Sequence, residues 1–278
     1  MLRHKITNVV DNLPFLPEHI DRLLQSAIKP TKDNIEILHK VSRDAGVWTS
    51  LLDMAKAYYG ECDNVKTVEE AIHCIGFEPL LHLIGVAYAR KAIEEEFASL
   101  KYLNEYFDHS EDISICCSII SRSLNISQTD RQTYTAAGLI HDIGRLALMV
   151  ATNRTSAHVL GTLWDKMASV VYEEKANLSM DHCEVGKLIC QKWNFSPAIQ
   201  EAVARHHSPV IDGDFSFGGA IIFISHFLSA SDPSGDIVST LSSAAEVLEN
   251  LKMTSDDFIK ARETYKSRIQ QDLERKPN

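Results

Sequence analysis

Residues 139–148 read LIHDIGRLAL, an apolar run interrupted by an adjacent histidine and aspartate, His141 and Asp142. Apolar residues continue on both sides, so the pattern over residues 133–150 predicts one buried helix. An ionised aspartate inside such a helix is costly unless a cation, a metal ion or several hydrogen-bond donors compensate its charge. Two interpretations follow: the pair binds a ligand, or it is a satisfied polar contact within a helical core.

The rest of the chain has helical periodicity as well. Near the N-terminus, one helical face is formed by Leu16, Ile20, Leu23, Leu24, Ala27 and Ile28. Helix starts are predicted at Thr67, which has a capping-box partner in Glu70, at Ser127, at Ser179 and at Ser196. Residues 76–79 should separate two helices, and no alternating stretch bounded by hairpin signals is found. The sequence therefore predicts an all-α, multi-helix fold.

Composition limits the classes of partner and the compartment. The chain has 28 Lys and Arg against 38 Asp and Glu, a formal net charge of −10, which argues against nucleic-acid and anionic-membrane binding. The first twenty residues interleave charges with apolar residues, unlike a secretory signal, and the apolar run at 218–230 is too short to span a bilayer. The six cysteines have no CxxC spacing, so we expect reduced thiols and a cytoplasmic protein.

Further histidines and a glutamate make a ligand interpretation of the His141–Asp142 pair more attractive. They are Glu105, His109, His182, His206, His207 and His226. Glu105 and His109 are four residues apart and would share one helix face. Each histidine alone is more often a core or surface residue, but together they form the imidazole and carboxylate set that binds Fe, Mn, Zn or Ni, and helical bundles build such sites from facing helices. Cys183, beside His182, is expected to be a small buried residue rather than a ligand.

The C-terminal region should form an addition to this helical core. Turn-forming residues gather at 229–237 and mark its start, and a second polar seam lies at 126–132. A charged helix is predicted over residues 255–276. Its apolar stripe is thin, so we expect a surface helix with a solvated face, and contact of the stripe with a partner is the alternative.

Five motifs in the right order resemble the HDOD family, the HD-related output domains of bacterial signalling. They are LPFLP at 13–17, VSRDAGVWTSLLDMAKAYYG at 41–60, KTVEEAIHCIGFEPLLHLI at 66–84, LIHDIGRLAL at 139–148 and DHCEVGKLICQKWNFSPAIQEAVARHH at 181–207. The resemblance implies a helical bundle like that of the HD superfamily, with an N-terminal helical half packed on it. It implies an HDOD-like domain at 13–212, divided into an N-terminal half (13–100) and an HD-like half (101–212), followed by a C-terminal helical extension at 213–278.

The wider HD superfamily contains metal-dependent phosphohydrolases, and its HD-GYP branch holds two or three metals. Seven residues match that branch's ligand positions: Glu105, His109, His141, Asp142, His182, His206 and His207. His226 falls where the branch has a final aspartate. By this resemblance the cofactor is one or two divalent transition-metal ions. If metals bind, Asp142 and Arg145 are the candidate catalytic residues: a carboxylate can bridge two ions, and Arg145, about one helical turn after the pair, is placed to contact phosphate oxygens. The alternative for Arg145 is a charged end to the buried helix.

The chain also departs from these families. The usual Asp-Pro is Asp44–Ala45, an Asn-Ser-Ala element is replaced around Lys56, and the HD-GYP signature after His207 is missing, which argues against cyclic di-GMP hydrolysis. No glycine-rich phosphate cradle is present. Three hypotheses follow: a signalling protein with a metal site and a protein partner, a metal-dependent phosphohydrolase with a phosphoester ligand, and a metal-free helical scaffold. The sequence leaves homo-oligomer formation open.

Overall fold

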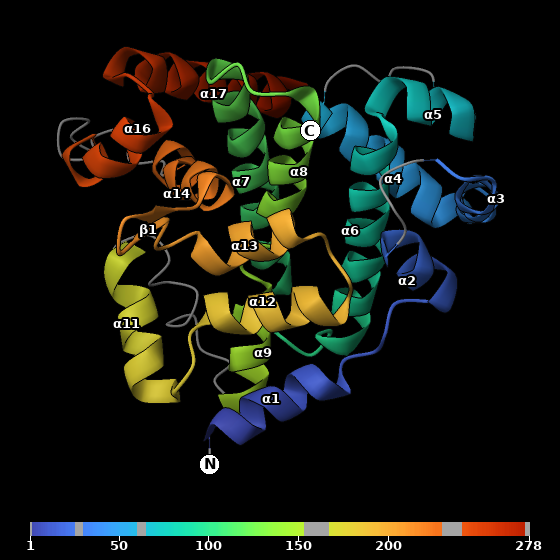
Figure 1. Cartoon of the computed structure of the whole chain (residues 1–278), viewed down its shortest axis with the longest axis horizontal. Helices are drawn as coiled ribbons and strands as arrows, with labels where there is room; N and C mark the ends of the chain where they lie inside the picture. The colour runs from blue at the N-terminus through green and yellow to red at the C-terminus, as the bar shows by residue number, and fades with distance from the viewer. Residues whose placement is uncertain (1, 26–29, 60–64, 153–166, 230–240, 276–278) are drawn as a thin grey trace.

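The computed structural model describes residues 2–25, 30–59, 65–152, 167–229 and 241–275 (Figure 1). Within these ranges the chain forms fifteen helices and one two-stranded hairpin, so the all-α prediction is confirmed. The elements are α1 (Leu2–Asn12), α2 (Glu18–Gln25), α3 (Lys32–Val41), α4 (Ala45–Tyr59), α5 (Val68–Ile75), α6 (Phe77–Glu96), α7 (Leu103–Ser123), α8 (Gln128–Gly138), α9 (Ile143–Thr152), α11 (Met167–Leu178), α12 (His182–Lys192), α13 (Pro197–Arg205), β1 (Val210–Ile211), β2 (Asp214–Phe215), α14 (Phe217–Ser229), α16 (Ala245–Leu251) and α17 (Ser255–Arg275).

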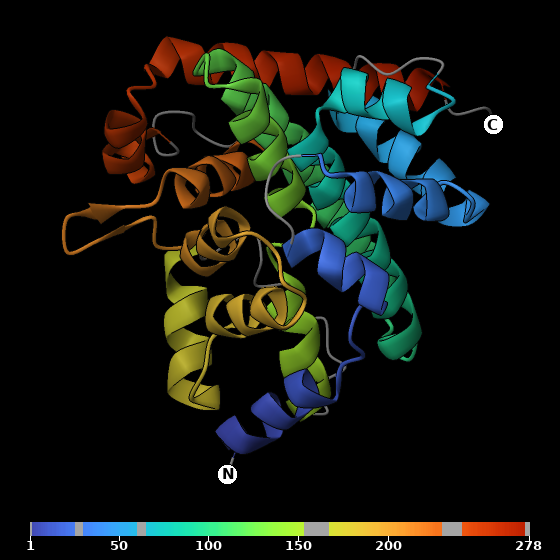
Figure 2. The same ribbon diagram turned by 45° about the vertical axis from the view of Figure 1, so that its right-hand side comes forward.

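The centre of the molecule is α7, a long helix that packs against α8, α14 and α17. The helices α12 and α13 pack on each other, and they reach the centre through contacts of α13 with α8 and α14. The red helix α17 lies across one end of α7 and α8 in both views (Figures 1 and 2). Its apolar residues Phe258, Ala261 and Tyr265 are buried at helical spacing. The predicted apolar stripe of this helix thus packs on its own chain.

The N-terminal helices attach to this core through several contacts. Helix α6 packs against α2, α4, α5 and α8, and α1 packs against α9 and α12. The indole Nε1 of Trp193, which follows α12, donates a hydrogen bond of 2.9 Å to the carbonyl of Pro14. Asn194 Nδ2 donates to Asp21 Oδ1 over 2.5 Å. The segment at 13–17 therefore lies against the end of α12.

Several local predictions are confirmed. Thr67 and Glu70 form a capping box at the start of α5, Ser127 caps α8, and Pro197 occupies the first turn of α13. The helical run is interrupted at Gly76, where the helix direction bends by 109° between α5 and α6. Among the described helices, none is by itself both long and apolar enough to cross a membrane; by length and composition only the bent α5–α6 pair passes that test.

Four predictions need correction. The expected single helix over 133–150 is broken, because residues 139–142 form turns between α8 and α9. Helix α12 begins at His182 rather than near Ser179, because Asp181 is the residue that forms its capping box. The chain also has a small hairpin, whose Asp212–Gly213 turn has positive φ at both residues. Cys74 is disulfide-bonded, so not all six thiols are free.

Candidate metal centre

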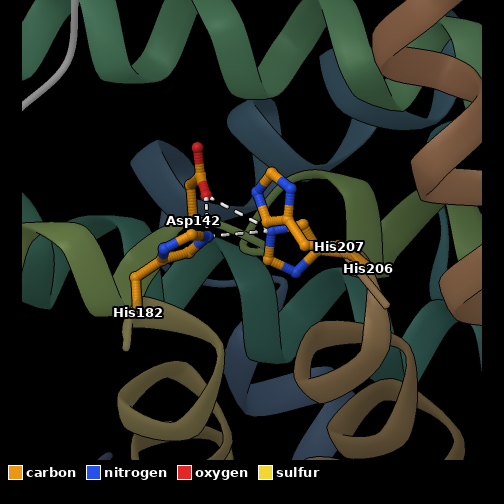
Figure 3. A group of neighbouring side chains, drawn as sticks. All are labelled: Asp142, His182, His206 and His207. Atoms are coloured by element: carbon orange, nitrogen blue, oxygen red, sulfur yellow. Dashed lines mark hydrogen bonds and ion pairs between the residues drawn. The ribbon is translucent and has the colours of Figure 1, made fainter. Parts of the chain in front are cut away.

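Seven buried side chains from the part of the chain between α7 and α14 converge in two adjoining sets. We call His109, His141 and His226 the first ligand group, and Asp142, His182, His206 and His207 the second ligand group. In each group, one possible ligand atom per residue lies within 4.8 Å of those of the other members. Figure 3 shows the second group, whose carboxylate and imidazole rings point toward one another. Between them the two groups take residues from α7, the 139–142 turn, α12, the end of α13 and α14.

The turn between α8 and α9 is what presents His141 and Asp142 together. In a continuous helix, adjacent side chains diverge by about 100°, whereas here both lie at the shared centre. Tight packing holds the turn in place: a Cβ on Gly144 would lie 2.0 Å from the carbonyl oxygen of His182. Only glycine allows the start of α9 to approach the start of α12 so closely. That approach brings Asp142 next to His182.

The two carboxylate oxygens of Asp142 face different ligand groups. Oδ1 lies 3.2 Å from His182 Nε2 and 3.4 Å from His206 Nε2. Oδ2 lies 3.5 Å from His141 Nε2 and 3.6 Å from His109 Nε2. Asp142 is 1% exposed, so these are contacts inside the protein. A carboxylate placed in this way can contribute one oxygen to each of two sites.

In three imidazole rings, a hydrogen bond at Nδ1 determines that Nε2 is the nitrogen that can bind a metal ion. Nδ1 of His141 lies 2.8 Å from the carbonyl of Gly138, and Nδ1 of His206 lies 2.7 Å from that of Val203. Nδ1 of His182 lies 2.5 Å from a carboxylate oxygen of Glu174. Carbonyl and carboxylate oxygens only accept hydrogen bonds, so each Nδ1 carries the proton. In the neutral rings, each Nε2 then presents its lone pair to the centre, the arrangement typical of metal-ligating histidines.

Glu174 and Arg145 surround the second group with charge. Oε2 of Glu174, on α11, also accepts the backbone N–H of His182 over 2.9 Å. Nε of Arg145 lies 2.9 Å from Asp142 Oδ1, and its Nη1 lies 3.8 Å from Glu174 Oε1. Arg145 is fully buried. Two carboxylates and one guanidinium thus form a buried charged network behind the imidazoles.

Burial and neighbouring charges set the protonation of the site. Burial tends to raise the pKa of Asp142, but the positive charge of Arg145 opposes it, and the pKa is held well below its usual range. Burial lowers the pKa of His109 to about 3 and holds the pKa values of His182, His207 and His226 well below their usual range. Burial raises the pKa of Glu174, opposed by Arg145. The aspartate is therefore charged and these imidazoles are neutral, the forms that bind metal.

The structure brings together most of the residues proposed from the sequence, with two differences. Glu105 is exposed in the first turn of α7 and is not part of either group. Four residues along a helix are about 6 Å along its axis, which leaves Glu105 outside the buried centre that His109 reaches. Arg145 neither ends a helix nor faces solvent; it is buried in the first turn of α9. It contacts the carboxylates of Asp142 and Glu174, and its role toward phosphate oxygens stays a prediction.

Sequence reasoning missed Glu174. It lies in YEEKANL at 172–178, where it resembles an ordinary exposed helix residue. Glu174 lies eight residues before His182 in the sequence. This spacing predicts a contact only if the chain turns back between α11 and α12, as it does in the structure. Cys183 is buried, as predicted.

Comparison with known proteins identifies the family. The HDOD domain model matches residues 13–209. The chain belongs to the HDOD family. Its helical fold is shared with a candidate phosphohydrolase from Shewanella amazonensis, with a TM-score of 0.68, 20% identity and coverage of 95% of this chain and 93% of that one.

Two further solved structures have the same fold. An HDOD domain protein of unknown function from Geobacter sulfurreducens has a TM-score of 0.58 at 16% identity, covering 95% and 96% of the two chains. A candidate signal transduction protein from Marinobacter aquaeolei has a TM-score of 0.55 at 13% identity, covering 96% of this chain and 64% of that one. Among curated proteins, no sequence matches this HDOD chain. At these identities the likeness concerns the fold alone.

Proposed function

We propose that this HDOD protein is a regulatory component of bacterial signal transduction and that its HD-like half holds divalent transition metal. Family membership supports the signalling role. The C-terminal extension belongs to the metal-holding unit, because α14 supplies His226 and packs on α7 and α13. With a net charge of −10, its partner is a protein rather than nucleic acid or an anionic membrane.

One observation carries the metal assignment: three acceptor atoms meet in the second ligand group. His182 Nε2 and His206 Nε2 are 3.2 Å apart, and both lie within 3.4 Å of Asp142 Oδ1. The lone pairs of both nitrogens and the charge of the carboxylate repel one another. Arg145 offsets part of the carboxylate charge, and a metal ion among the three atoms would also offset the repulsion of the lone pairs. Fe, Mn, Zn and Ni all accept this combination of imidazole and carboxylate ligands.

Burial favours a regulatory or structural role for the metal over turnover of a substrate. No side chain in either ligand group is more than 7% exposed. The ligands come from five segments that are far apart in sequence, so ions bound in the two groups would tie α7, the 139–142 turn, α12, the end of α13 and α14 to one another. Loss of the ions would loosen these segments together, which is how metal occupancy could change the surface offered to a partner.

Elemental analysis of protein expressed in metal-supplemented medium tests this proposal. We expect at least about one equivalent of transition metal, and a fall in melting temperature after chelation, because an ion at 100 times its dissociation constant stabilises the fold by about 2.7 kcal/mol. Protein with less than about a tenth of an equivalent, and a melting temperature that chelator leaves unchanged, would support the metal-free scaffold instead.

A metal-dependent phosphohydrolase is the second candidate. It is favoured because the two carboxylate oxygens of Asp142 face different ligand groups. Hydrolases with two metals place them about 3.5–4 Å apart, and a shared carboxylate suits that spacing. Bound ions would lower the pKa of a water and polarise a phosphoester. In this chain, Asp142 contacts both groups and fixes their positions relative to each other. Glu174 keeps the His182 ring in the orientation that points Nε2 toward the centre of the second group.

Hydrolysis of a chromogenic phosphodiester by the metal-loaded protein separates the two candidates. Activity that disappears in both His141→Ala and Asp142→Asn would establish the hydrolase. Activity indifferent to both substitutions would come from a contaminant. A metal-loaded protein without activity on phosphomonoesters or phosphodiesters supports the regulatory role.

A further inference from the structure

Helix α11 is attached to the start of α12 by a narrow strip of side chains. Between residues 170 and 178, the buried residues are Val170, Glu174 and Leu178, which are four apart and share one helix face. Most of the other side chains in this stretch are exposed, and Tyr172 is 75% exposed. Both views show α11 at the edge of the molecule (Figures 1 and 2). This helix therefore packs on the rest of the chain along one thin face.

The residue at the middle of that strip is charged and closes the second ligand group. Oε2 of Glu174 lies 2.5 Å from His182 Nδ1 and accepts the backbone N–H of His182 over 2.9 Å. The Glu174 side chain is 10% exposed, whereas those of His182 and Arg145 are completely buried. Glu174 is thus the partly accessible member of this contact, and α11 covers the second ligand group at this point.

The outer edge of the same contact is a pair of exposed ion pairs. Nζ of Lys175 lies 3.4 Å from Glu184 Oε1 and 3.8 Å from Asp181 Oδ2. Exposed ion pairs contribute little to stability, so this edge can open and close. A helix of twelve residues such as α11 is marginal in water by itself. If α11 leaves α12, it should therefore also lose helical structure.

We propose that α11 is a metal-controlled cover, which closes over the second ligand group when an ion is bound there and opens to let the ion enter or leave. The inference rests on the proposed metal site and names the element that responds to it. When His182 Nε2 coordinates an ion, the Nδ1–H of the ring becomes a better donor to Glu174. Metal occupancy is thereby converted into covering or exposure of the start of α12.

The size of the effect follows from linkage. A carboxylate that supports a ligating imidazole in this way strengthens metal binding by about 10–100-fold. Coupling between two equilibria is reciprocal. Bound metal should therefore favour the closed position of α11 by the same factor of about 10–100.

Hydrogen exchange followed by mass spectrometry tests the proposal on the full chain. Exchange is compared between zinc-loaded and metal-free protein, in peptides from α11 and from α5. Zinc should slow exchange in α11 by about 10–100-fold, because its amides exchange when the helix detaches and unwinds. Exchange in α5, which packs on α3 and α6 away from the ligand groups, should change far less.

Glu174→Gln separates the metal-controlled cover from ordinary packing of α11. The amide keeps the shape of the side chain and removes its charge. At zinc concentrations that saturate the second ligand group, α11 of this variant should gain little protection from zinc. Glu173→Gln, a change of the exposed neighbouring side chain, is the matched control and should behave like the unaltered protein.

Lys175→Glu is a second variant, and its side chain is exposed, so it tests the proposal if Glu174→Gln does not fold. The substitution turns attraction to Asp181 and Glu184 into repulsion. We expect zinc to be released into an excess of chelator several-fold faster than from the unaltered protein. Lys187→Glu, the same reversal of an exposed charge on α12, is the control and should not change the release rate.

The outcomes separate this inference from the metal proposal. Zinc that binds without slowing exchange in α11 overturns the cover and leaves the metal site standing. Equal protection of α5 also overturns it, because zinc would then stabilise the whole fold. An unchanged release rate in Lys175→Glu contradicts passage of the ion beneath α11. Protein that binds no zinc overturns both proposals.

Discussion

The two ligand groups on either side of Asp142 are built differently. In the second group, the His182 ring is held by Glu174, the His206 ring by a backbone carbonyl, and Asp142 Oδ1 by Arg145. In the first group, the His141 ring is held by a backbone carbonyl, while the rings of His109 and His226 stack with their centroids 5.3 Å apart. The second group therefore has charged residues behind its ligands, and the first consists of imidazoles packed on one another.

This difference predicts unequal affinity for metal. A carboxylate that accepts the distal N–H of a ligating imidazole raises the basicity of the ring and fixes its orientation. In the second group, Glu174 is such a carboxylate, behind the His182 ring. We therefore expect the second group to bind tightly and the first weakly, with Asp142 as the residue on which both depend.

Asp142→Asn should have the largest effect, because it removes the charge that both groups share. We expect metal to be lost from both, and the free energy of unfolding to fall by about 3–5 kcal/mol, since Arg145 loses the closest carboxylate of a buried ion pair. Elemental analysis and denaturant unfolding measure the two effects. Asp108→Asn, an exposed change on α7, is the control. An Asp142→Asn protein that keeps full metal would show that the carboxylate is not a shared ligand.

Comparison of His182→Ala with His141→Ala tests the unequal affinity directly. The first substitution should abolish the tight site, and the second should leave it nearly unchanged while removing the weak one. Competition with chelators of graded affinity measures both variants. Equal losses from the two substitutions would mean that the groups bind as one unit and that the proposed asymmetry is wrong.

Glu174→Gln should have an intermediate effect confined to the second group. Loss of a hydrogen-bonded partner behind a ligand lowers metal affinity by about 10–100-fold. Glu174 touches only His182 and Arg145 in this centre, so the weak site should keep its affinity. Glu173→Gln, its neighbour on α11 with an exposed side chain, is the matched control. A change in the weak site alone would contradict the assignment of Glu174 to His182.

Glu105→Gln should have the smallest effect. Because Glu105 is exposed and outside both groups, metal content should not change and the free energy of unfolding should shift by no more than about 0.5 kcal/mol. Isothermal titration with Zn²⁺ and thermal unfolding are sufficient measurements. A clear loss of metal in this variant would restore the ligand role that the four-residue spacing to His109 suggests.

Much of the site could be read from residue types. His141, Asp142 and the downstream histidines stand out because imidazoles and a carboxylate are rare in apolar helical segments, and their order resembles the HDOD pattern. The hairpin at 210–215 could also have been found, since Asp212–Gly213 is a recognised turn pair. The break at 139–142 is harder to predict, because the segment has helical periodicity on both sides.

Glu105 and Glu174 show where sequence reasoning stops. Spacing places Glu105 on roughly the same helical face as His109, but it cannot say how far the buried part of that face extends. Glu174 lies in a polar helix and gains its role only when α11 and α12 pack so that His182 turns toward it.

The sequence by itself determined the helical class, most helix starts, the family and the residue types of a metal centre, because periodicity, capping and ligand chemistry are local properties. Only the tertiary structure decided which side chains meet. The division of Asp142 between two groups and the support from Glu174 and Arg145 depend on segments that lie as far apart in sequence as His109 and His226. Close approach at Gly144 and burial bring these segments together, and neither distance nor burial is encoded in the spacing of residues along the chain.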